Sequence, residues 1–71
     1  MAHPETAGIK PNERLLRINS VIKRVGLGRS TIYKKVKEGG FPKPIKLGER
    51  AIAWRESDIE EWISRRHQAD F

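Results

Sequence analysis

Residues 28–37 read Gly-Arg-Ser-Thr-Ile-Tyr-Lys-Lys-Val-Lys, and this stretch decides the fold. A helix turns by about 100° per residue, so Ile32 and Val36 fall on one side of the segment. Hydroxyl and ammonium groups fall on the other side or flank it, and Tyr33 lies at the border. The pattern predicts a short basic helix that is fixed to its support by a narrow apolar stripe and ends at the glycine pair 39–40.

The residues before this segment predict another helix, joined to the basic one by a tight turn. Val21, Ile22 and Val25 have the spacing of one buried helix face. We expect Asn19 to cap the start of this helix, because its side-chain oxygen can accept a free backbone N–H. Gly26 suits the left-handed position just past the helix end. Two short helices joined by a few residues that include glycine form a helix-turn-helix.

The residues after the basic segment predict a small hairpin, or wing. Phe41-Pro42-Lys43-Pro44 contains two prolines, which exclude a helix and favour an extended backbone. Residues 45–47 then alternate apolar and polar side chains, as a half-buried strand does. Residues 48–50 supply a turn, and residues 51–55 return as the partner strand, with Ile52 and Trp54 on one face.

A closing helix is expected next. Ile59, Trp62 and Ile63 form its buried stripe, so Trp62, like Trp54 of the hairpin, is interpreted as a core residue. Ser57 and Glu60 have the S-x-x-E spacing of a capping box at the helix start.

The domain organisation follows from these elements and from the length of 71 residues. We predict a flexible N-terminal arm at residues 1–13, a single domain at 14–66 that begins with a short strand at 15–18, and a frayed C-terminus at 67–71. The expected fold is a small α+β winged helix-turn-helix with three short helices and a β-hairpin wing.

The composition favours a polyanionic partner. The chain carries 15 Lys and Arg against 9 Asp and Glu, a formal net charge of +6. Such a charge can also serve solubility alone. The absence of cysteine excludes disulfides, thiol catalysis and Cys-based zinc sites. His3 and His67 lie near opposite ends of the chain, so we expect no metal site.

Several other function classes are disfavoured as well. No apolar run approaches the roughly 18 residues that a membrane helix requires, and no apolar segment follows the start as in a signal peptide. We therefore expect a cytoplasmic protein. No nucleophile–base pair, phosphate loop or metal cluster is visible, so we expect no enzymatic activity, no cofactor and no small-molecule ligand.

Residues 15–66 contain an ordered set of short segments: Leu15-Leu16-Arg17, Gly26-Leu27, Arg29-Ser30-Thr31-Ile32-Tyr33, Phe41-Pro42-Lys43-Pro44, Ile45-Lys46-Leu47-Gly48, Trp54-Arg55-Glu56-Ser57 and Trp62-Ile63. This set resembles the AlpA family of phage and prophage regulators, which have a MerR-like winged-helix fold related to excisionases. The likeness departs at Gly28, where serine is usual, and at Asn19, where proline is common.

The resemblance implies which residues contact double-stranded DNA. Those that match the recognition helix are Arg29, Ser30, Thr31, Tyr33 and Lys34, and those that match the wing are Lys43, Lys46 and Arg50. Lys37 joins the first group, because the helical pattern places it on the outward side. A purely structural role is the alternative for these residues. Tyr33 is then a core aromatic, and the hydroxyls of Ser30 and Thr31 form local hydrogen bonds at the helix start. The lysines of the helix then form a solvated face.

We interpret the chain as a sequence-specific DNA-binding transcriptional regulator of prophage integrase or excision genes, associated with a bacterial nucleoid. Further copies of the chain are expected on adjacent DNA motifs. One alternative is an architectural excisionase, which bends DNA to direct recombination. Another is a protein-interaction module, such as an antirepressor or antitoxin, whose basic helix binds an acidic partner.

Overall fold

The structure, a computed structural model, describes residues 12–69. Within that range the chain forms β1 (Leu15–Leu16), α1 (Ile18–Val25), α2 (Arg29–Glu38), β2 (Ile45–Lys46), β3 (Ile52–Arg55) and α3 (Glu56–Ser64). The strands make one antiparallel sheet in the order β1–β3–β2. The predicted small α+β fold, with three short helices and a hairpin, is confirmed.

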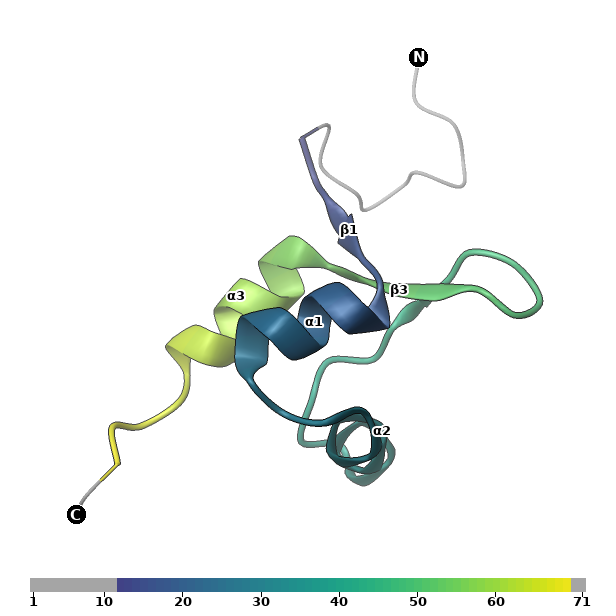
Figure 1. The fold of residues 1–71 in the computed structure, drawn as a ribbon. Coiled ribbons are helices and arrows are strands. Elements are labelled where there is room, and N and C mark those ends of the chain that lie inside the picture. Colours follow the sequence, from purple (N-terminus) through teal and green to yellow (C-terminus); the bar gives the residue numbers. More distant parts are fainter. Residues whose placement is uncertain (1–11, 70–71) are drawn as a thin grey trace.

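The core lies where the three helices meet the central strand β3. Leu16 of β1 pairs with Trp54, and Ile45 of β2 pairs with Ala53, so both neighbours of β3 hold it in register. The side chains of Trp54, Ile32, Ile59 and Val21 are the largest that are fully buried. Burying each such side chain contributes about 1.5–3 kcal/mol. In Figure 1 α2 is viewed along its axis, and α1 lies in front of α3, to which the ion pair of Arg24 with Glu60 joins it.

Glycines end α1 and α2, as the sequence predicts. Gly26 has a φ of 76° and donates its N–H to the carbonyl oxygen of Ile22 at 2.8 Å. Gly39 has a φ of 86° and ends α2 in the same left-handed conformation. Only glycine adopts this conformation without a steric penalty. The two glycines therefore fix the length of α2 and the turn that leads into it.

Asn19 does not cap α1, so this prediction is wrong. The helix begins one residue earlier, at Ile18, and the capping position is Arg17, whose side chain makes no capping bond. The first helical hydrogen bond runs from the N–H of Val21 to the carbonyl oxygen of Arg17 at 3.0 Å. Ile18, the first residue of the helix, is partly buried and packs against the core.

The capping box of Ser57 and Glu60 is also wrong. The helix α3 begins at Glu56, so Ser57 lies inside its first turn. Both the backbone N–H (3.2 Å) and the hydroxyl of Ser57 donate to the carboxylate of Glu13. The pairing of β1 with β3 brings Glu13 there, since the N–H of Glu56 donates to the carbonyl oxygen of Arg14 at 2.9 Å.

The predicted arm and tail are described only in part. Residues 1–11 of the arm and 70–71 of the tail lie outside the described residues. Glu13, at the end of the predicted arm, is half-buried and holds the start of α3 through Ser57. The first strand is shorter than expected and ends at Leu16.

Candidate nucleic-acid interface

The outer face of α2 is polar, basic and open to solvent. Its inner face is anchored by Ile32, which is fully buried, and by the half-buried Val36, the stripe that the sequence predicts. The residues of α2 that were expected to contact DNA are all exposed: Arg29, Ser30, Thr31, Tyr33, Lys34 and Lys37. A rigid helix anchored on one side can thus present this whole set to a partner.

Tyr33 lies at the edge of this face. Its side chain is 40% exposed, and its ring centroid lies 6.5 Å from that of Trp54. The ring therefore covers one side of the core tryptophan and leaves its remaining surface in solvent. Both interpretations of this residue, core aromatic and surface contact, describe part of its position.

The hairpin contributes a further set of exposed cations: Lys43, Lys46 and Arg50. Lys46 belongs to β2 and is in register with Ile52 of β3. The bend that carries Arg50 is closed by the N–H of Leu47, which donates to the carbonyl oxygen of Ala51 at 2.7 Å. In Figure 1 this bend projects away from the helices, so its side chains can reach a partner beyond them.

The cations of α2 and the hairpin have no acidic partner among the described residues 12–69. Residues 29–50 hold seven Lys and Arg against two Glu. Within residues 12–69, none of these seven forms an ion pair; the pairs are Arg14–Glu56, Arg24–Glu60, Arg55–Asp58 and Arg65–Glu61. Every acidic partner lies on α3. The fold therefore neutralises its carboxylates on α3 and leaves a positive potential over α2 and the hairpin.

The tightest of these pairs joins α1 to α3. Arg24 donates to both carboxylate oxygens of Glu60, at 2.6 and 2.8 Å. This hydrogen bonding and the charge of Glu60 raise the pKa of Arg24 above its ordinary value. The charge of Arg24 is thus neutralised by Glu60, whereas the cations of α2 form no ion pair within residues 12–69.

Asn19 is the residue near this face that the sequence did not reveal. Its Oδ1 accepts a hydrogen bond from Nη2 of Arg29 at 3.1 Å. The two residues belong to different helices and meet only because Gly26 turns the chain between them. The sequence pattern of either helix alone does not predict this contact between α1 and α2.

Two indole groups, the buried one of Trp54 and the half-buried one of Trp62, hold the connection between α2 and the hairpin. Nε1 of Trp54 donates to the carbonyl oxygen of Pro42, and Nε1 of Trp62 donates to that of Gly40, each at 2.8 Å. Phe41 lies between them, buried, with its ring centroid 4.7 Å from that of Trp62. These contacts fix the path of the chain from the end of α2 to Lys43.

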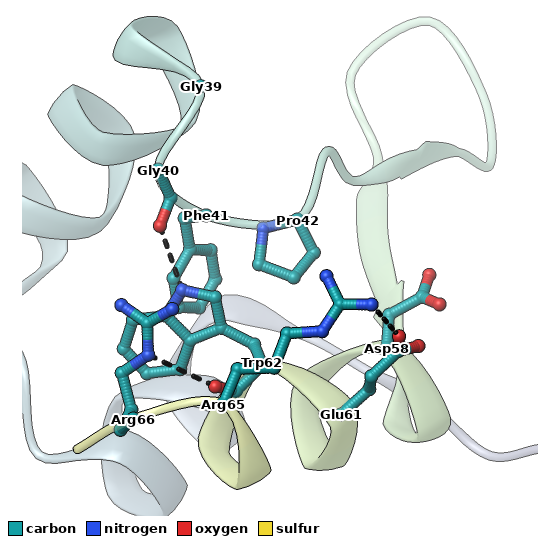
Figure 2. A pocket seen from close by; sticks show the side chains of 9 residues that line it. All are labelled: Gly39, Gly40, Phe41, Pro42, Asp58, Glu61, Trp62, Arg65 and Arg66. Atoms are coloured by element: carbon teal, nitrogen blue, oxygen red, sulfur yellow. Dashed lines mark hydrogen bonds and ion pairs between the residues drawn. The ribbon is translucent and has the colours of Figure 1, made fainter.

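A groove of about 360 Å³ lies between this connection and α3. Figure 2 shows Arg66 stacked on the ring of Trp62, with its guanidinium carbon 4.4 Å from the ring centroid. Arg65 pairs with Glu61 on the same helix. None of the nine residues expected to contact DNA lines this groove. The groove is therefore separate from the candidate interface, and Arg65 and Arg66 are among the residues that line it.

No group of three or more His, Cys, Asp or Glu side chains among residues 12–69 is placed to hold a metal ion. Within the same residues, no helix has the length and apolar character needed to cross a membrane.

The fold and this face define a small basic α+β module with one helix and one hairpin whose cations are largely exposed to solvent. The chain belongs to the family described as prophage CP4-57 regulatory protein (AlpA), whose model matches residues 14–67. This places it among phage and prophage regulatory proteins, the family that its sequence resembles.

Two relatives show the extent of the similarity. The chain is 41% identical over 54 residues to the uncharacterized protein ORF88 of Enterobacteria phage P4, a match that covers 76% of this chain and 61% of that protein. It is 37% identical over 59 residues to the DNA-binding transcriptional activator AlpA of Escherichia coli K12, which covers 75% of this chain and 84% of the relative. The chain thus spans less than two thirds of the P4 protein.

Proposed function

We propose that this chain is a sequence-specific DNA-binding transcriptional regulator built as a winged helix-turn-helix over residues 14–66. The helix α2 enters a major groove as the recognition helix, and the β2–β3 hairpin lies as a wing on the adjacent backbone or minor groove. The observation that carries the proposal is the separation of charge. Within residues 12–69 the cations of α2 and the hairpin form no ion pair, and all of them except the half-buried Lys35 are exposed, while the acids of α3 pair with arginines.

In this proposal some residues of the face bind phosphates and others contact base edges. Lys34, Lys37 and the three hairpin cations bind phosphates, which supplies affinity and fixes the register on the duplex. Arg29, Ser30 and Thr31 lie at the start of α2, where a recognition helix contacts base edges. The identity to a relative named as a DNA-binding transcriptional activator supports this assignment. The expected targets are prophage integrase or excision genes on the bacterial nucleoid.

A titration of fluorescent duplex DNA with the protein at increasing salt tests the proposal. Binding through several phosphates predicts that the logarithm of the association constant falls linearly with the logarithm of the salt concentration. An acidic peptide of matched charge serves as the competing partner. Stronger binding to the peptide than to any duplex would instead support a protein-interaction module.

Mapping the bound sites in a host genome distinguishes regulation from recombination. Occupied sites in promoters, with changed transcription of the adjoining genes, support a regulator. Sites confined to an attachment region, with bent DNA and unchanged transcription, would support the architectural excisionase instead.

A further inference from the structure

Asn19 and Arg29 meet across the turn that joins α1 to α2. Nη2 of Arg29 donates to Oδ1 of Asn19 at 3.1 Å, and both side chains are exposed. Arg29 forms no ion pair within residues 12–69. A neutral amide on one helix therefore holds a cation at the first residue of the other.

The chemistry of this contact suits orientation rather than neutralisation. A carboxylate in place of the amide would cancel the charge that attracts DNA, whereas an amide oxygen leaves it intact. The guanidinium is planar, so a bond at one nitrogen fixes the directions of its remaining N–H donors. A side chain already held in its bound orientation loses less freedom when its partner arrives.

We propose that Asn19 is a positioning residue that orients Arg29 to read a guanine in the major groove. This inference rests on the proposed function. Arginine bonded to O6 and N7 of guanine is the commonest specific contact in that groove, and Arg29 occupies the end of α2 from which bases are read. Asn19 thereby contributes to the sequence preference from α1, through Arg29 alone.

The test selects binding sites for the full chain from a library of random-sequence duplexes and compares N19A, R29A and N19A/R29A. We expect R29A to lower the preference for one G·C pair about 10-fold. N19A lowers the preference at the same pair about threefold, and the double variant loses no more than R29A. N19Q, which keeps the amide, restores part of the preference.

Two controls separate positioning from stability. S20A changes the neighbouring exposed residue of α1, whose side chain forms no hydrogen bond within residues 12–69, and should select the wild-type motif. Alanine is a better helix former than asparagine, so N19A should keep the thermal midpoint of the wild type.

The outcomes distinguish this inference from the function it rests on. If N19A selects the wild-type motif, weakens all duplexes equally, alters a different base pair from R29A or adds fully to R29A, the positioning role is refuted and the proposed function stands. If the wild-type chain itself enriches no motif, the proposed function fails and the inference fails with it.

Discussion

The indole N–H of Trp54 donates to the carbonyl oxygen of Pro42 at 2.8 Å, which ties the central strand to the connection between α2 and the hairpin. Trp62 makes the equivalent bond to Gly40 from α3. The position of α2 relative to the hairpin therefore depends on two tryptophans, one buried and one half-buried, that lie behind the proposed DNA-binding face. We expect changes at these tryptophans to affect both stability and the proposed binding.

Two replacements of Trp54 separate the contribution of its buried apolar surface from that of its hydrogen bond to Pro42. W54A removes a fully buried indole and should cost about 3–5 kcal/mol of unfolding free energy. W54F keeps most of the apolar surface, loses the bond to Pro42 and should cost less than W54A. Urea denaturation followed by circular dichroism measures both. An unchanged midpoint for W54A would contradict the core assignment.

Gly26 should be the more sensitive of two glycines that are open to solvent. G26A forces alanine into a left-handed conformation and should cost about 1–2 kcal/mol, although a Cβ there meets no atom within 4 Å. G48A is the matched control, because Gly48 has the same open surroundings and a negative or extended φ. Equal denaturation midpoints for the two variants would contradict the strain argument.

Glu13 should act as a cap for α3 although it lies far from that helix in the sequence. E13A removes the acceptor of the Ser57 N–H and hydroxyl bonds and should cost about 1 kcal/mol, the usual value of a lost cap. E49A, in the exposed bend of the hairpin, serves as the control of equal charge. Denaturation curves of both variants measure the difference, and a larger loss for E49A would exclude the cap.

The sequence predicted where the helices lie better than where they start. The sequence located the three helices because apolar residues repeat within each of them with the helical period. One residue of each repeat is fully buried in the structure: Val21 in α1, Ile32 in α2 and Ile59 in α3. The helix starts were wrong at Asn19 and Ser57, because each position is decided by tertiary contacts. Ser57 is bonded to a carboxylate 44 residues away, and Asn19 meets an arginine ten residues away.

The candidate interface was predictable in its composition but not in its electrostatics. Exposed polar positions on α2 follow from the same helical period that buries Ile32 and Val36. The sequence contains acids on both sides of residues 29–50, and nothing in their spacing shows that Arg24 pairs with Glu60 and Arg14 with Glu56, because these partners lie far apart in the chain. Only the fold reveals which cations remain unpaired.

Charge reversal on α2 tests the proposed face directly. K34E places an anion against phosphates and should abolish specific duplex binding, while an exposed substitution shifts stability by no more than about 0.5 kcal/mol. K23E makes the same change at an exposed residue of α1, outside α2 and the hairpin, and should weaken binding far less. Gel-shift titrations paired with thermal melting compare them. Retained binding by folded K34E would exclude α2 as the recognition helix.

The small size of the face predicts how the protein finds its site. A single module of this kind buries about 600–1,000 Å² of protein surface, and each matched base pair contributes about 1–3 kcal/mol of discrimination. One recognition helix and one hairpin read only a few base pairs, which is little against the competing sites of a genome. We therefore expect the natural site to hold two or more copies of a short motif.

The spacing of these copies should be near one helical turn, about 10 base pairs, or a multiple of it, because bound copies then share one face of the duplex. Scrambling one motif in footprinted DNA should lower the occupancy of the other and reduce regulation in cells. The control is the same scramble in spacer DNA between the motifs, which should change neither. Full occupancy and regulation from a single motif would show that one copy of this chain suffices.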